Sequence, residues 1–417
     1  MTSLLEDLRE AAPTAAKAVE YLVVPRRFTR EQALEILGVH VSPNGYSPAL
    51  LAVLSETGIL RRTNEFLTIA EETRLPALKS LPPDQLSALA IAWQGATVRR
   101  PEESSVLLDA AYLGLLAGAA EGATSIRREF GEAEVEGGSE RQSFLARLAG
   151  QGEGQYGLLP AEARASLYYV LGISRYHRGD RARAMTYFEK AVDTGARTLD
   201  VAICAHLLAN QWAKKRTSWA EAESLYKKSV AIGQELREAS HAGQAQHSYA
   251  NLLARDPRRF ATAEAEYLES IASLEDAEDS YGVAITQHSY ANLLATRKNR
   301  FADAEGFYLE SIATLGGAAD EYGAAQIEHS YANLLAGEID RWAEATALFE
   351  KTLATGERLG LKAHVSQVKF RYGEFLCSSN IDRGAGLRLL KESLDLEEEM
   401  NSPFVDKVQK AYKRYSQ

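Results

Sequence analysis

The sequence has few cysteines, and this scarcity excludes the class of small disulfide-stabilised secreted proteins. Among 417 residues only Cys204 and Cys377 are cysteines. Two thiols so far apart in the chain do not make a disulfide framework, and they are typical of a reducing compartment. We therefore expect a cytoplasmic protein.

A hydrophobic run long enough to cross a membrane is also lacking. The longest apolar stretch, 106–120, contains Asp109 and falls short of the roughly 20 residues that a membrane span needs. Near the start of the sequence, Glu6, Asp7 and Glu10 interrupt any apolar segment of a signal peptide. We expect no membrane association.

Positive charge is in deficit, because 47 Lys and Arg residues stand against 57 Asp and Glu residues, for a net charge of −10. This balance disfavours nucleic acid as the partner of the whole chain. No Gly-Lys dipeptide occurs, so a phosphate-binding P-loop is excluded. The glycines of 152–157 match a dinucleotide-binding pattern, but the flanking segments are helical in pattern, whereas that motif follows a strand. We interpret the match as accidental.

The dominant feature of the sequence is an internal repeat. The octapeptide His-Ser-Tyr-Ala-Asn-Leu-Leu-Ala begins at His247, His288 and His329, every 41 residues, and a diverged copy begins at His206. A second block keeps the same period, with an aromatic residue, an alanine, another aromatic residue and a hydroxyl residue in register. These columns are Trp219, Phe260, Phe301 and Trp342; Ala222, Ala263, Ala304 and Ala345; Tyr226, Tyr267, Tyr308 and Phe349; and Ser229, Ser270, Ser311 and Thr352. A fixed period of this length indicates tandem structural units.

Each unit is predicted to be a pair of helices. Tyr249, Leu252 and Leu253 in the first block have the i, i+3, i+4 spacing of one helical face. In the second block Phe260 and Tyr267 share a face, and Pro257 separates the two segments. A helix pair of this kind buries its apolar face only by stacking against neighbouring units.

These residues resemble the tetratricopeptide repeat (TPR) family. Gly172, Gly179, Ala184, Phe188 and Ala191 follow its pattern of small and aromatic residues. The later units are similar to the longer repeats of kinesin light chain, although a serine or threonine replaces the second-helix alanine. The resemblance implies an all-α fold, with a right-handed TPR-like α-solenoid of about six helix hairpins over 158–400 and a capping helix over 401–417.

The first third of the sequence differs from the repeats. Thr29 and Gln32 form a capping box, and three helical segments precede a possible hairpin within 59–69. This order resembles a winged helix. We expect a winged-helix-like domain over 1–78, a helical connector over 79–130 and a linker rich in glycine and acidic residues over 131–157.

A winged helix raises the question of DNA binding. The candidate recognition helix, 48–56, carries no Arg, Lys, Asn or Gln, the side chains that read the major groove. Arg61 and Arg62 are candidate phosphate contacts. We favour a winged helix used for protein contacts.

The candidate binding residues are a histidine and an asparagine four residues apart in each repeat, on one helical face. They are His206, His247, His288 and His329, with Asn210, Asn251, Asn292 and Asn333. Neighbouring first helices lie about 8–10 Å apart, too far for one metal ion to collect these imidazoles. We find no catalytic constellation and expect no enzyme activity, metal or cofactor.

Two interpretations of these residues remain open. They either hydrogen-bond between repeats as structural elements or line a groove that holds a peptide. The resemblance implies that first helices line the concave surface, where an asparagine suits the second role because its amide both donates to and accepts from a peptide backbone. We predict a non-enzymatic adaptor or scaffold that binds a peptide or protein segment in this groove. The alternatives are a TPR-containing transcriptional regulator with a DNA-binding winged helix, and a regulatory protein controlled by partner binding or by cleavage of the 131–157 linker.

Overall fold

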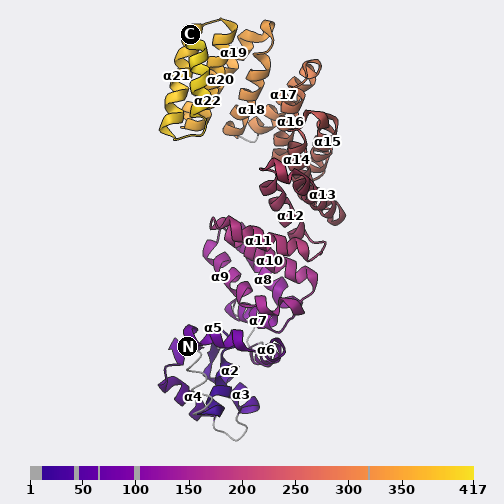
Figure 1. Cartoon of the computed structure of the whole chain (residues 1–417). Helices are drawn as coiled ribbons and strands as arrows, with labels where there is room; N and C mark the ends of the chain where they lie inside the picture. Colours follow the sequence, from indigo (N-terminus) through magenta and orange to yellow (C-terminus); the bar gives the residue numbers. More distant parts are fainter. Residues whose placement is uncertain (1–11, 42–46, 64–65, 98–103, 318–319) are drawn as a thin grey trace. The chain divides into compact units, whose positions relative to one another are not determined.

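A computed structural model describes the chain except for residues 1–11, 42–46, 64–65, 98–103 and 318–319 (Figure 1). The protein is an all-α, TPR-like helical repeat protein with one small sheet near its N-terminus. It divides into two compact units, Met1–Leu208 and Ala209–Gln417. Along the described segments, no helix combines the length and the apolar character required to cross a bilayer.

The first unit begins with three helices and three short strands. The helices are α2 (Pro13–Leu22), α3 (Arg30–His40) and α4 (Ser47–Glu56), and the strands are β1 (Phe28–Thr29), β2 (Leu60–Thr63) and β3 (Phe66–Ile69). The strands form an antiparallel sheet in the order β1-β3-β2. The capping box is confirmed, because the Thr29 hydroxyl accepts from the Gln32 backbone N–H and the Gln32 side chain accepts from that of Thr29. The hairpin is confirmed by the pairing of β2 with β3, although its turn lies outside the described residues.

The rest of the first unit is helical. Its elements are α5 (Glu71–Ser80), α6 (Pro83–Thr97), α7 (Ser104–Leu116), α8 (Ala120–Val135), α9 (Ser139–Gln151), the 3-10 helix η1 (Glu153–Leu158), α10 (Ala161–His177) and α11 (Arg181–Asp193). The buried guanidinium of Arg74 donates to the Val24 and Pro25 carbonyls and to the Tyr112 hydroxyl. These bonds fix the chain before β1 against α5 and α7, and they satisfy a charge that is costly to bury alone.

The expectation of a loop or linker over 131–157 is wrong, because α8, α9 and η1 occupy most of that segment. Two of its glycines, Gly137 and Gly152, meet a local geometric requirement. Gly137 has a φ of +69° where α8 ends, a conformation that favours glycine. A Cβ at Gly152 would lie 2.5 Å from the Leu115 side chain. The dinucleotide-like match falls in η1 after a helix, which confirms it as accidental.

The second unit consists of successive antiparallel helix pairs (Figure 1). Helix α12 (Leu199–Trp212) leads into it. The following helices are α13 (Trp219–Leu236), α14 (Ala239–Leu253), α15 (Phe260–Asp276), α16 (Ser280–Leu294), α17 (Phe301–Gly317), α18 (Glu321–Leu335), α19 (Trp342–Arg358), α20 (Lys362–Ser379), α21 (Arg383–Glu399) and α22 (Val405–Ser416). Short 3-10 turns precede four of the second helices: η2 (Arg216–Ser218), η3 (Pro257–Arg259), η4 (Lys298–Arg300) and η5 (Ile339–Arg341).

The repeat columns form the core of the second unit. The alanines at 222, 263, 304 and 345 are fully buried, and Tyr226, Tyr267 and Tyr308 are nearly so. The serine that departs from the family pattern has a direct role, since the Ser270 hydroxyl donates to the Gly243 carbonyl at 2.7 Å and the Ser311 hydroxyl to Ala284 at 2.6 Å. A buried hydroxyl is thereby satisfied while the two helices stay in close contact.

Candidate functional site

The first helices of the repeats are α12, α14, α16, α18 and α20, and each is followed by a second helix. The face that these first helices form carries the predicted asparagines. Asn210, Asn292 and Asn333 are exposed and Asn251 is half-exposed. Each lies near the C-terminal end of its helix, four residues after the histidine of the same repeat. The structure therefore presents these amides at the surface, one from each repeat.

A tyrosine of the same repeat fixes the orientation of three of these amides. The hydroxyls of Tyr226, Tyr267 and Tyr308 donate to Oδ1 of Asn210, Asn251 and Asn292 at 2.7, 2.7 and 2.8 Å. Since Oδ1 accepts from a hydroxyl of the core, the Nδ2 group of each amide is the part that is left to donate. Burial raises the pKa of Tyr226 to about 12 and that of Tyr267 higher still, so both hydroxyls stay protonated.

Asn333 differs because its repeat has Phe349 where the others have tyrosine. Its Oδ1 has no tyrosine hydroxyl to accept from. Its Nδ2 group donates to the His329 carbonyl of the same helix at 2.8 Å. The repeat preserves the asparagine but changes its orientation. The tyrosine column was visible in the sequence as a repeat position, and its constant separation of 16 residues from the asparagine was the signal for this pairing.

The histidines of the second unit lie deeper than the asparagines and connect neighbouring repeats. His247 Nδ1 shares a hydrogen bond of 2.8 Å with Thr286 Oγ1, and His288 Nε2 shares one of 2.9 Å with Ser330 Oγ. Burial lowers the pKa of His247, His288 and His329 to about 4. These imidazoles are therefore neutral near pH 7. His206 is half-buried on α12.

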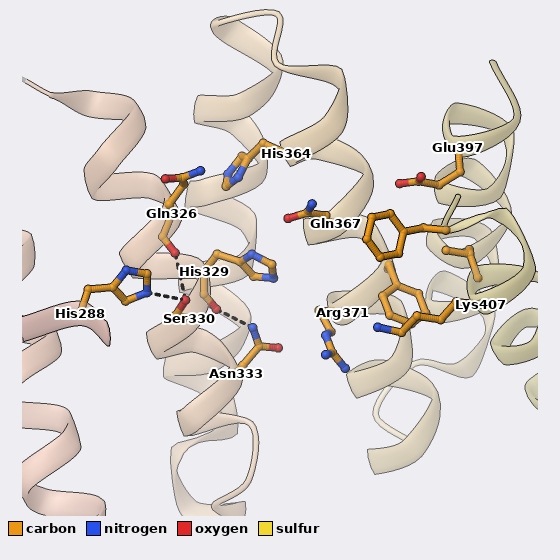
Figure 2. A pocket seen from close by; sticks show the side chains of 13 residues that line it. His288, Gln326, His329, Ser330, Asn333, His364, Gln367, Arg371, Glu397 and Lys407 are labelled. Atoms are coloured by element: carbon orange, nitrogen blue, oxygen red, sulfur yellow. Dashed lines mark hydrogen bonds between the residues drawn. The ribbon is translucent and has the colours of Figure 1, made fainter. Parts of the chain in front are cut away.

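Two hollows lie side by side on this face. The first has a volume of about 440 Å³ and is built from α16, α18, α20, α21 and α22 (Figure 2). We call it the terminal pocket, and its defining residues are His329, Asn333, Phe370, Arg371, Glu397 and Lys407.

The second hollow has a volume of about 560 Å³, and Asn292, Phe301, Tyr308 and Asn333 contribute to its lining. Ser330, Asn333 and Arg371 belong to both hollows. Asn292 therefore borders the second hollow, and Asn333 borders both. The sequence did not point to Arg371, Glu397 or Lys407.

The candidate phosphate contacts are elsewhere, in the first unit. Arg61, on β2, forms an ion pair with Glu72. The exposed described side chains of the neighbouring α4 include Ala52 and Val53, and Glu56 is the charged one among them. Arg62 is exposed beside it on β2, and the described side chains of α4 include no Arg, Lys, Asn or Gln of the kind that reads base edges.

Chemistry that needs a metal finds no support in the described segments, where no three His, Cys, Asp or Glu side chains are grouped as ligands. The thiols of Cys204 and Cys377 are unpaired and buried, and burial raises the pKa of both. A raised pKa keeps a thiol protonated and poorly nucleophilic.

Comparison with known proteins supports the fold. No family model matches the chain, and no curated protein matches its sequence. Among solved structures, the apo form of RapI is similar with a TM-score of 0.52 at 11% identity, over 83% of this chain and 95% of that one. At such low identity the similarity establishes a shared helical repeat fold and nothing further.

Two further solved structures are similar to a lesser degree. A Rap protein complexed with competence and sporulation factor has a TM-score of 0.45 at 12% identity, over 82% of this chain and 93% of that one. The Rap conjugation gene regulator of the plasmid pLS20, in complex with the Phr* peptide, has a TM-score of 0.40 at 14% identity, over 94% and 97%.

Proposed function

We propose that this protein is a non-enzymatic adaptor or regulator that binds an extended peptide segment along the first-helix face of its second unit. The observation that carries the proposal is the set of tyrosine-to-asparagine hydrogen bonds at Asn210, Asn251 and Asn292. They leave three amide donors at the surface in a repeating arrangement. A peptide backbone offers a carbonyl acceptor at every residue and needs no particular side chain to meet them.

Preorganisation strengthens this interpretation. An exposed asparagine normally samples several rotamers, and ordering it on binding costs free energy. Here the tyrosine hydroxyl has already oriented the amide before a guest arrives. A purely structural bond would satisfy the tyrosine equally well, so exposure of the amide and the adjoining hollows favour the binding role.

The histidines have a structural role in this proposal. Their rings are mostly buried, and His247 and His288 bond to the next repeat. They hold neighbouring first helices in register and thereby set the spacing of the asparagines.

The region 1–78 is, in this proposal, a winged-helix-like domain that contacts protein. The order of α2, α3 and α4 around a three-stranded antiparallel sheet supports the assignment. The small and apolar exposed residues of α4, together with Glu56, suit a protein surface better than the phosphate backbone of DNA. We place the protein in the cytosol, in keeping with its reduced thiols.

The test starts from a peptide probe selected on the protein itself. A library of random peptides displayed on phage is panned against the full chain, and recovered peptides are synthesised with a fluorophore for anisotropy measurements. We expect Asn251→Ala with Asn292→Ala to weaken binding about tenfold or more, since each lost hydrogen bond is worth about 0.5–1.5 kcal/mol.

The control is Asn299→Ala, because Asn299 is exposed in η4 and outside the first-helix face. It should bind like the wild type, and the double variant should unfold at a similar urea concentration. Unchanged affinity in the double variant, or loss of its cooperative unfolding, would contradict the proposal and favour the structural interpretation of the asparagines.

A further inference from the structure

The final repeat departs from the column pattern on its first helix, at residues that line the terminal pocket. Phe370 occupies the column that holds histidine in the preceding repeats, and Arg371 occupies the column that holds Ser330. Both side chains belong to the pocket wall. An aromatic ring and a cation thus replace the polar pair found in the earlier repeats.

A similar departure occurs on α21 and at an earlier position of α20. Glu397 of α21 occupies a column that holds Gly356 one repeat earlier and Leu315 and Leu274 in the two repeats before that. Ser366 of α20 stands where Ala325 stands one repeat earlier. Packing alone would retain a small or apolar residue at both positions, because burying a polar group costs free energy.

Glu397 is the central feature of this group. Its side chain is only 4% exposed, and its Oε1 accepts from the Ser366 hydroxyl at 2.6 Å. The Ser366 hydroxyl is 3.0 Å from that of Ser393, which completes a small polar cluster. Oε2 of Glu397 is buried and has no partner among the residues that the structure describes.

The carboxyl group of Glu397 belongs to the pocket wall. Figure 2 shows the carboxyl group of Glu397 pointing from α21 toward the pocket interior. A buried acceptor without a donor is destabilising, and more so when it is charged. A guest that brings a donor, above all a cation, recovers that loss on binding.

Two cationic side chains, Arg371 and Lys407, also line this pocket. Arg371 and Lys407 lie over the ring of Phe370 at 5.4 and 5.2 Å from its centroid. Arg371 is 3.1 Å from Glu374, and Lys407 is exposed. In the view of Figure 2 these two side chains lie below Glu397. The pocket therefore offers a carboxylate in one part and two cations in another, with aromatic surface beside the cations.

We propose that the terminal pocket binds a lysine or arginine side chain of the guest peptide, with its cation at Glu397 and a neighbouring carboxylate of the peptide at Arg371 and Lys407. This inference rests on the proposed function, because the guest is the peptide held by the asparagines. The volume of about 440 Å³ lies within the range of small-ligand sites. The methylene groups of a basic side chain suit the aromatic surface.

The test uses pools of labelled random heptapeptides in which one position at a time is fixed as lysine, arginine or the uncharged norleucine. Each pool is made with a free C-terminal carboxylate and as the amide. We expect the wild-type full chain to prefer a basic pool at one position by at least tenfold over norleucine. Glu397→Gln should abolish this preference, whereas Glu398→Gln, which removes the neighbouring exposed carboxylate, should retain it.

The source of the carboxylate is read from the free-acid and amidated pools, and from further pools in which Asp, Glu or norleucine is fixed beside the basic residue. Weaker binding after amidation assigns a C-terminal carboxylate, and unchanged binding with a preference for Asp or Glu beside the basic residue assigns a side chain. Either preference should weaken in Arg371→Ser, which restores the residue of the earlier repeats. A carboxylate preference that Arg371→Ser leaves intact would overturn this half of the proposal.

A structural role for Glu397 predicts a different outcome. Glu397→Leu restores the apolar column, so the ligand-site interpretation predicts an unchanged or raised Tm together with loss of the basic preference. A lowered Tm would assign the carboxylate to stability. Binding without a basic preference, or a preference that survives Glu397→Gln, would overturn this inference alone. Failure of every pool to bind would overturn the proposed function and this inference together.

Discussion

A single hydroxyl group determines how each groove asparagine is oriented. Tyr267 and Tyr308 donate to Asn251 and Asn292, whereas Phe349 leaves Asn333 to bond to its own helix. The asparagine is present in all of these repeats, but its Oδ1 accepts from the core only where the tyrosine hydroxyl exists. In our proposal, the binding unit is therefore the tyrosine and asparagine together.

The buried histidines make a prediction about pH. The pKa values of His247, His288 and His329 are about 4 in the folded protein, below the ordinary value of about 6.5. Between these values the unfolded chain binds protons that the folded chain does not, so the free energy of unfolding falls as the pH falls from 6.5 to 4. Each histidine contributes at most about 1.4 kcal/mol per pH unit over this window.

Urea unfolding at pH 7.0, 6.0 and 5.0, followed by a signal from the second unit, measures how the free energy of unfolding depends on pH. His247→Gln should flatten this dependence, since the amide keeps a polar partner for Thr286 but does not titrate. His177→Gln, which removes an exposed imidazole, is the matched control. A wild-type stability that stays constant or rises between pH 6.5 and 5 would contradict the burial of these rings.

At the scale of the element, neighbouring repeats are joined by a recurring cluster of arginine, glutamate and tyrosine. Arg259 lies 2.6 Å from Glu223 of the preceding second helix, and the Tyr249 hydroxyl donates to the same carboxylate at 2.7 Å. The hydrogen bond from Arg259 is the largest of the interactions that lower the pKa of Glu223 to about 2. The next two repeats contain the same arrangement at Arg300 and Arg341.

This cluster predicts that one arginine stabilises the repeat stack while its neighbour does not. Arg259→Met should lower the free energy of unfolding by about 1 kcal/mol, because a half-exposed ion pair within a hydrogen-bonded network lies at the upper end of surface values. Arg258→Met removes an exposed arginine that pairs with Asp256 inside its own turn, and it should leave the free energy of unfolding essentially unchanged. Equal effects in urea unfolding would show that the contact between repeats contributes nothing.

Some helices of this protein could be predicted from the sequence and others could not. The repeat columns predicted the helix pairs because each column maps onto one buried face, as the fully buried Ala222 and Ala263 demonstrate. The segment 131–157 was misjudged because its glycines resemble loop composition. In the structure they act at helix ends and at a close contact with Leu115, a long-range relation that composition does not encode.

The binding site was predictable only in part for the same reason. The asparagines were found because they repeat. Glu397 and Arg371 were missed because they break the repeat, and a single deviation has meaning only when its neighbours in space are known. The terminal pocket gathers such deviations from α20 and α21 beside α22.

At the scale of the whole molecule, the two compact units differ in secondary structure and, in our account, in function. The unit Met1–Leu208 contains the small sheet, and the unit Ala209–Gln417 contains the asparagines and both hollows. Peptide recognition is thus assigned to the second unit. The first unit is left to contact a further protein.

The central claim is that the amide groups of Asn210, Asn251 and Asn292 donate directly to a bound peptide. The most direct measurement is NMR of the full chain labelled with nitrogen-15 in the asparagine side-chain amides, titrated with a peptide selected on the protein. We expect the Nδ2 resonances of these three residues, assigned by their loss in alanine variants, to shift in a saturable manner while that of Asn299 stays in place. Saturable peptide binding with all three resonances unmoved would contradict the account.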